Sequence, residues 1–115
     1  METKKKFFMS CCVAGRKYHD ADEVWDKLKV GTLLQLQRDL DNRFDPDAVA
    51  VMFHDEETNE DYCLGFIPRE VNKHFAAILE MGWTDVFECR ISRTRLDILP
   101  EAQIQMTIKI KRNVA

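Results

Sequence analysis

The sequence predicts a mainly β domain of the α+β class, a small antiparallel barrel of about six strands with two helices in the order βαβββαββ. Six short segments alternate apolar and polar residues, which is the period of a strand. Two further segments carry apolar residues at helical spacing. Strands and helices do not alternate regularly, so the pattern disfavours a parallel sheet, and closure into a barrel would remove exposed sheet edges.

The first strand and the first helix lie on either side of a glycine. Residues 7–14 place apolar side chains on both faces and are predicted to form a mostly buried strand that ends at Gly15. Asp20 and Glu23 stand three residues apart, as in a capping box, and the apolar residues that follow share one helical face. The sequence therefore predicts a short helix over residues 21–29.

The middle of the chain is predicted to hold three strands and one polar loop. The strands cover residues 32–38, 48–53 and 62–67. Between the first two, residues 39–47 are dense in Asp, Asn and Pro, which favour turns, so this stretch is predicted to be a loop. Gly65 interrupts the last strand and predicts a bulge or a close approach of another backbone segment.

The last third is predicted to form a helix followed by two long strands. Pro68 suits the first turn of a helix, and Gly82 suits its C-terminal end. Residues 86–91 and 103–111 then alternate apolar and polar positions, which predicts two antiparallel strands with one buried face.

Length and charge limit the possible organisation and partners. At 115 residues, the chain is expected to form one domain over residues 1–115, with a flexible tail at 1–6 and a C-terminal tail at 112–115. Its 17 basic and 20 acidic residues give a net charge of −3. This balance excludes the uniformly basic composition of a chromatin-type duplex binder, but it is compatible with a local basic patch.

The chain lacks the common catalytic motifs, including the phosphate-binding loop, the dinucleotide glycine pattern, the nucleophile elbow and the zinc-protease helix. Its four cysteines show no C-x-x-C spacing and are expected to be free thiols, so we expect neither a metal nor a cofactor. The scattered histidines, such as His19, are expected to be solvated. The nine-residue apolar stretch after Lys6 is too short to span a bilayer, and we expect a soluble, cytoplasmic protein without a membrane partner.

The most specific signal lies in three blocks near predicted loops. They are Gly15-Arg16-Lys17-Tyr18, the stretch LQRDLDNRFDPDAVAV over residues 36–51, and Gly65-Phe66-Ile67-Pro68-Arg69. Together these blocks resemble the HIRAN domain family. That family combines a glycine turn after the first strand with an L-x-R-[DE]-x-x-N-x-[YF]-D-x-x-A-[VI]-x-V block and a G-[YFH]-[IL]-P-[RK] block. The resemblance covers roughly residues 8–95.

The resemblance implies a fold and a function. It implies an OB-like or SH3-like barrel that binds single-stranded DNA at a free 3′-hydroxyl end, in DNA repair or replication-fork processing. The implied partners are the 3′ end itself and a helicase or other DNA-processing protein. Hydrolase activity in this family belongs to fused helicase-like domains, so we expect no enzyme activity in this chain.

Eight residues are the candidate DNA contacts. Single-strand binding combines cations that meet phosphates with aromatic rings that stack on bases. By resemblance, the cations would meet phosphates and the loop aromatics would meet bases, while Phe66 is as compatible with the core as with stacking. The candidates are Arg16, Lys17, Tyr18, Asn42, Phe44, Asp45, Phe66 and Arg69.

Asp45 has the sharpest implied role. A carboxylate accepts a hydrogen bond from a terminal hydroxyl but repels a phosphodiester, so it can select chain ends. The same residues also suit a structural interpretation, in which Asn42 and Asp45 cap backbone amides of the loop and Phe44 closes the barrel end. Some family members carry consecutive aromatics where this chain has Lys17, which would weaken stacking and strengthen phosphate attraction.

Two functions from different classes follow. The first is a DNA-binding module that neutralises about three or four phosphates, for which log K should fall with log salt at a slope of roughly −2 to −3. The alternative is a protein-interaction adaptor without nucleic-acid affinity, docking through the barrel mouth or through the edge formed by Lys109, Lys111 and Arg112.

Overall fold

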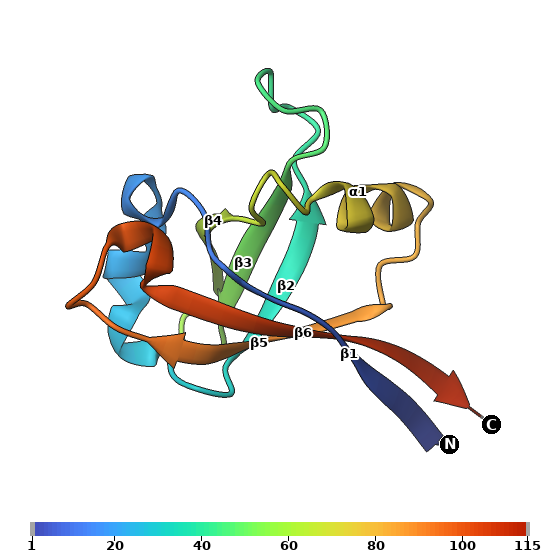
Figure 1. The fold of residues 1–115 in the computed structure, drawn as a ribbon. Coiled ribbons are helices and arrows are strands. Elements are labelled where there is room, and N and C mark those ends of the chain that lie inside the picture. The colour runs from blue at the N-terminus through green and yellow to red at the C-terminus, as the bar shows by residue number, and fades with distance from the viewer. Residues whose placement is uncertain (1, 115) are drawn as a thin grey trace.

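The computed structural model describes residues 2–114, without the side chains of Glu2, Lys17, Asn113 and Val114. Its strands form one antiparallel six-stranded sheet in the order β1-β6-β5-β2-β3-β4 (Figure 1). This confirms the predicted mainly β fold with its six strands. The strands are β1 (Glu2–Cys12), β2 (Leu33–Arg38), β3 (Val49–Asp55), β4 (Glu60–Phe66), β5 (Phe87–Thr94) and β6 (Ile104–Val114).

A short bridge joins the two ends of the sheet. Just after β1, the backbone N–H of Ala14 donates to the carbonyl of Phe66 at 2.8 Å, and the N–H of Phe66 donates back to Ala14 at 2.9 Å. This pair connects the chain leaving β1 to the end of β4, the opposite edge of the sheet. The sheet therefore curls into a barrel-like fold.

Gly65 makes this closure possible, and both alternatives predicted for it are confirmed. The β3–β4 register shifts there, because Val51 pairs with Gly65 while Met52 pairs with Cys63. A Cβ atom on Gly65 would lie 2.3 Å from the carbonyl oxygen of Ala14, and the φ angle of +149° also disfavours a side chain. Only glycine fits a bulge with so close a backbone neighbour.

The two predicted helices are present, but their geometry and bounds differ from the prediction. The first is a 3-10 helix, η2 (Asp20–Lys27), with a kink at Val24. Its buried residues Ala21 and Val24 stand three apart, the spacing that a 3-10 turn brings to one side. The second, α1 (Lys73–Glu80), begins five residues after Pro68, because residues 68–72 form turns first. Two single 3-10 turns, η1 (Arg16–Tyr18) and η3 (Pro100–Ala102), complete the chain.

The core lies between the curled sheet and α1. Five apolar residues of β5 and β6 face inward and are at most 1% exposed: Cys89, Ile91, Ile104, Met106 and Ile108. Phe75 of α1 is fully buried and packs edge-on against Phe8, with ring centroids 5.5 Å apart. Phe87 contacts both rings. This aromatic cluster seats α1 on the sheet.

The predicted tails are instead strands. Residues 2–6 of β1 pair with residues 110–114 of β6, from Glu2 opposite Val114 to Lys6 opposite Ile110. We call this two-stranded extension the arm; it projects beyond the barrel beside the two termini (Figure 1). The basic run of residues 4–6 suggested a solvated tail, but it pairs as a strand with Ile110, Lys111 and Arg112 of β6. Residues 1 and 115 lie outside the described part.

Candidate functional site

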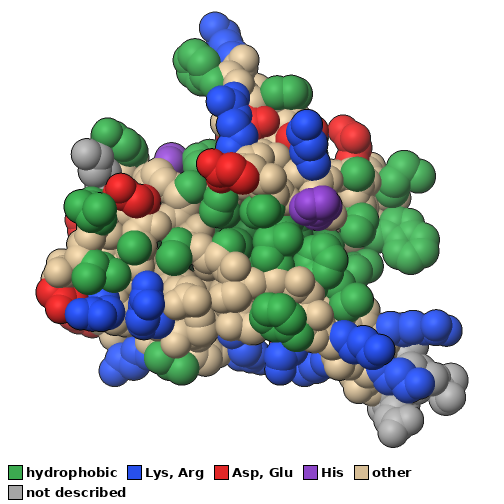
Figure 2. Space-filling model, in the orientation of Figure 1, with side chains coloured by type: hydrophobic (Ala, Val, Ile, Leu, Met, Phe, Trp, Pro, Cys, Tyr) green, Lys and Arg blue, Asp and Glu red, His purple; other side chains and the backbone are tan. Residues whose placement is uncertain are grey.

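A hollow of about 310 Å³ lies where the turn after β1, the loop before β3 and the end of β4 meet. The loop, residues 39–48, projects from the body of the molecule (Figure 2). Five of the eight predicted site residues line the hollow together with Ala14 and Gly15: Asn42, Phe44, Asp45, Phe66 and Arg69. Three blocks that are far apart in the sequence thus meet at one place.

Asn42 folds the loop that forms one wall. Its Oδ1 atom accepts hydrogen bonds from the backbone N–H groups of Phe44 at 2.9 Å and Asp45 at 3.0 Å. Asparagine side chains form such turns because they mimic a backbone carbonyl. Arg38 holds the other end of the loop by donating to the carbonyls of Pro46 and Ala48. The structure therefore supports the loop-holding role considered for Asn42, while its predicted contact with a phosphate stays a prediction.

Asp45 is fixed in the hollow but keeps room to accept further hydrogen bonds. Its Oδ1 accepts from the backbone N–H of Asp47 at 2.9 Å, and its Oδ2 accepts from the Nδ2 of Asn72 at 2.8 Å. The side chain is 19% exposed. Since an ionised carboxylate offers about four acceptor positions, two protein bonds leave capacity for a ligand hydroxyl. Asp45 is thus neither a pure backbone cap nor fully solvated.

Arg69 and Phe44 form the exposed rim. The Nη2 of Arg69 donates to the carbonyl of Phe44 at 2.5 Å, and its Nε lies 3.6 Å from the Oδ2 of Asp45. The Arg69 side chain remains 70% exposed, so its other donors face solvent. Phe44 is 87% exposed, which contradicts the structural interpretation in which its ring closes the barrel end. An exposed ring beside an exposed cation suits an aromatic and anionic ligand.

The structure places Arg16 outside the lining of the hollow. This residue follows Gly15, but its side chain is 5% exposed and turns away from solvent. Its Nη2 donates to Asp22 at 2.8 Å, and its guanidinium carbon lies 4.6 Å from the centre of the Trp25 ring. The guanidinium thus stacks on the indole and pairs with a carboxylate, while its Nε is buried without a hydrogen-bond partner. Arg16 therefore packs against η2, and its side chain does not present its charge to solvent.

Tyr18, in the same block, is not among the described residues that line the hollow. Tyr18 lies in η1, directly after Arg16 and Lys17, and its side chain is 75% exposed. Its backbone N–H donates to the carbonyl of Gly15 at 3.1 Å, which ties η1 to the edge of the hollow. The side chain of Lys17 lies outside the described part, so its predicted contact remains a prediction.

Phe66 and the unpredicted His19 form the third side. The rings of His19 and Phe66 meet edge to face, with centroids 5.2 Å apart, and Phe66 also lines the hollow. His19 was expected to be a solvated side chain, but it is half-buried against this ring. Asn72, which is 2% exposed and holds Asp45, was also missed. Its only signal in the sequence is a polar residue just before a helix.

The cysteines with the largest pKa shifts, Cys11 and Cys89, do not line the hollow. Burial raises the pKa of Cys11 to about 11 and that of Cys89 to about 12, so these thiols stay protonated at neutral pH and are poor nucleophiles. Within residues 2–114, no cluster of three or more potential metal ligands is formed by described side chains. Nor does that part of the chain include a helix with the length and apolar character needed to cross a membrane.

Comparison with known proteins identifies relatives of the whole domain. The family profile of the HIRAN domain matches residues 6–112. Over 92 residues the chain is 30% identical to the Fanconi-associated nuclease 1 homolog of Oryza sativa subsp. japonica. The aligned segment covers 80% of this chain but only 8% of the rice protein. The activity named for the rice protein therefore belongs to a much longer chain.

Two crystal structures share the fold. A protein from Lactobacillus plantarum superposes with a TM-score of 0.77 at 18% identity, covering 97% of this chain and all of the other. The HIRAN domain of human HLTF superposes with a TM-score of 0.63 at 15% identity, covering 93% of this chain and 78% of the other. At such identities, the likeness concerns the fold alone.

Proposed function

The chain belongs to the HIRAN domain family and is a DNA-binding domain, and we propose that its hollow grips single-stranded DNA at a free 3′-hydroxyl end. The observation that carries the proposal is Asp45, a carboxylate that lines the hollow, is held in place by two hydrogen bonds and keeps free acceptor positions. A terminal hydroxyl donates a hydrogen bond to such an oxygen, whereas an internal phosphodiester would bring a second negative charge to it.

The surrounding residues would read the rest of the last nucleotide. The exposed ring of Phe44 offers a face for base stacking, and Phe66 with His19 forms a second aromatic surface. Arg69 would meet the first phosphate while it remains near Asp45, so the same cation would orient the carboxylate and attract the strand. Asn72 acts as a positioning residue, since it holds the Oδ2 of Asp45.

This binding mode suits roles in DNA repair or replication-fork processing, with a helicase or another DNA-processing protein acting on the same strand. The HIRAN domain is not itself catalytic, so any strand remodelling would come from such a partner. These wider roles rest on the 3′-end proposal and are tested only after it.

Fluorescence anisotropy with 5′-labelled oligonucleotides that end in a 3′-hydroxyl or a 3′-phosphate tests the proposal. We expect the hydroxyl end to bind about 10- to 100-fold more tightly, the worth of a hydrogen bond to a charged group together with the avoided repulsion. Asp45→Ala should abolish the preference. Asp45→Asn, which keeps the shape but removes the charge, should let the phosphate end bind as well as the hydroxyl end.

Asp41→Ala is the matched control, because Asp41 is an exposed carboxylate of the same loop outside the hollow. It should preserve the preference. Equal affinity of the unmodified protein for both ends would refute end recognition, and no binding at low salt would favour the adaptor without nucleic-acid affinity.

A further inference from the structure

A second and larger cavity, of about 820 Å³, lies between α1 and the arm. We call it the groove. Figure 2 shows hydrophobic side chains gathered on this face and Lys and Arg side chains gathered toward the arm.

The apolar surface of the groove comes from both of its sides, from strands β1 and β6 and from α1 with the turn after it. The residues are Phe8, Ile78, Met81, Trp83, Val86 and Ile110. Met81 is 76% exposed and Trp83 is 65% exposed. Large side chains left open to solvent in one patch mark a binding surface.

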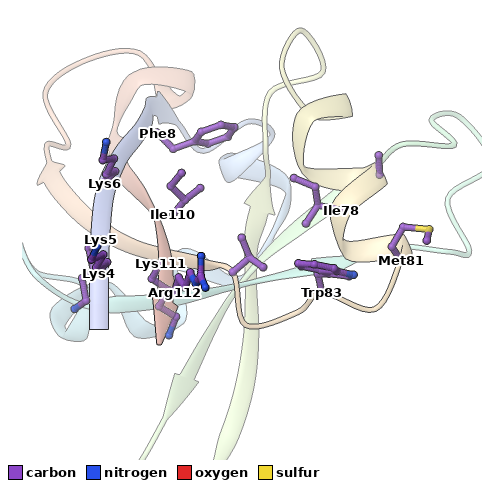
Figure 3. A pocket seen from close by; sticks show the side chains of 12 residues that line it. Lys4, Lys5, Lys6, Phe8, Ile78, Met81, Trp83, Ile110, Lys111 and Arg112 are labelled. Carbon is purple, nitrogen blue, oxygen red and sulfur yellow. The ribbon is translucent and has the colours of Figure 1, made fainter. Parts of the chain in front are cut away.

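The charge in the groove is confined to one wall. All its cationic side chains come from the arm, whereas α1 and the turn after it contribute uncharged side chains such as Ile78, Met81 and Trp83 (Figure 3). Lys5 is paired with Glu88 at 2.8 Å and Lys111 with Asp85 at 3.0 Å. Lys4, Lys6 and Arg112 have no ion pair or side-chain hydrogen bond with any described residue. Three cations therefore remain available beside an apolar floor that carries no carboxylate.

From this asymmetry we propose that the groove binds a peptide segment of a partner protein that presents acidic side chains on one flank and large apolar side chains on the other. The apolar side chains would pack on Trp83 and Met81, and the carboxylates would meet the unpaired cations of the arm. Exposed Trp and Met are typical of protein interfaces, where aromatic anchors provide most of the binding free energy.

A nucleic acid strand fits the groove less well. It carries a charge on every nucleotide and needs cations along its path. The α1 wall of the groove has none, and the partial negative charge of the α1 C-terminus lies at this wall. The groove is therefore suited to a ligand with one charged flank and one neutral flank.

The test selects ligands without assuming their sequence. Random 12-residue peptides displayed on phage are selected on the immobilised full chain. The enriched peptide, carrying a fluorescent label, is then titrated by anisotropy, and the tryptophan emission of the unmodified chain is followed in parallel. We expect a consensus that combines Asp or Glu with two or more large apolar residues, and a blue shift as Trp83 leaves water. Binding should weaken about thirtyfold or more in Trp83→Ala, the loss typical of an interface anchor.

Matched charge reversals distinguish a local effect of the arm on peptide binding from the effect of the net charge of the protein. The double variant Lys4→Glu with Lys6→Glu should weaken binding about tenfold or more, whereas Lys29→Glu with Lys73→Glu, an equal change at exposed positions outside the groove, should leave it within about twofold. No enrichment, a consensus without acidic residues, or equal losses in both double variants would overturn the proposal.

Two competing occupants are measured directly. An oligothymidine whose affinity falls only in the Lys4 and Lys6 double variant would assign the groove to nucleic acid and overturn the peptide proposal. The other competitor is a second copy, since residues 96–101 expose Leu96 and Leu99 beside Asp97 and Glu101. Sedimentation of the unmodified chain as oligomers that dissociate in Trp83→Ala would likewise overturn the proposal, while a monomer is expected.

Discussion

The hollow and the groove show two ways of making a binding surface on one small barrel. The hollow is lined by turns whose polar groups bond to one another, so that Asp45 stands in one orientation. The groove is lined mainly by carbon, with cations on a single wall. The first arrangement suits recognition of a single ligand atom. Its side chains are already ordered in the folded protein, so little conformational entropy is lost when the ligand binds. The second suits ligands that vary in sequence but share a charge pattern.

The two regions also depend on the fold differently. The hollow is built around the bridge between Ala14 and Phe66, so its geometry requires the sheet to close there. The groove depends instead on the seating of α1 by the aromatic cluster and on the pairing of the arm. A change at the closure should therefore damage the hollow more than the groove.

Gly65→Ala is the strongest test of this difference. The new Cβ would lie 2.3 Å from the carbonyl oxygen of Ala14 and 2.6 Å from the Cγ1 of Val13, so the bridge must open. We expect a loss of roughly 3 kcal/mol or more in the free energy of unfolding, measured by denaturant titration. At a low temperature at which the Gly65→Ala variant is still folded, its preference for the 3′-hydroxyl should be reduced, while peptide binding in the groove should persist.

Gly31→Ala is the matched control for Gly65→Ala. Its φ angle of +93° also disfavours a side chain, but no atom lies within 4 Å of the added methyl group. It should cost about 1 kcal/mol, the strain of the backbone alone. Equal losses in both variants would mean that the closure is not what makes Gly65 necessary.

A second comparison is between two arginines, one in the first block and one at the rim of the hollow. Arg69 is exposed at the hollow, whereas Arg16 is buried against Trp25. Arg69→Met should reduce the slope of log K against log salt by about 0.7, the contribution of one phosphate on a single strand. Arg16→Met should leave this slope unchanged and instead lower stability by about 1–2 kcal/mol through the lost cation–π contact.

With Arg16 occupied, the expected salt slope is smaller than the one predicted from the sequence. About two neutralised phosphates would give a slope near −1.4 rather than −2 to −3. Anisotropy titrations at several salt concentrations measure it. A decrease of the slope in Arg16→Met would return Arg16 to the set of phosphate contacts.

Much of the fold could be predicted because its signals are local. Alternation in β5 and β6 predicted which residues are buried, and Gly65 predicted the bulge. The helix predicted over residues 21–29 is present, but its 3-10 geometry could not be predicted, since apolar residues three apart fit both an α-helix and a 3-10 helix. The arm was missed because its strands carry mainly cations, and only their mutual register reveals them.

The site was predictable in part for the same reason. The loop around Asn42 is formed by short-range hydrogen bonds, which leave a pattern in the sequence. The direction of the Arg16 side chain depends on η2, and the support of Asp45 depends on Asn72, 27 residues away. The groove has no motif at all, because its walls combine both ends of the chain with α1. Long-range packing decides these features, and one sequence does not display it.

The smallest predicted effect concerns the ion pair that anchors the arm. The ammonium of Lys5, 2.8 Å away, lowers the pKa of Glu88 below its ordinary value of 4.5. Because the folded state holds this proton less tightly than the unfolded state, the pair stabilises the fold fully above pH 4.5, and this contribution is lost as the pH falls through the lowered pKa.

Glu88→Gln should therefore lower stability at pH 7 by at most about 1 kcal/mol, the usual worth of a partly exposed pair, and the difference should shrink toward pH 3. Thermal melting at both pH values measures this, with Glu101→Gln, an exposed residue of η3, as the control. A difference that stayed constant with pH would show that Glu88 supports the arm by packing rather than by charge, and 3′-end preference should be unaffected in either case because the hollow shares no residue with this pair.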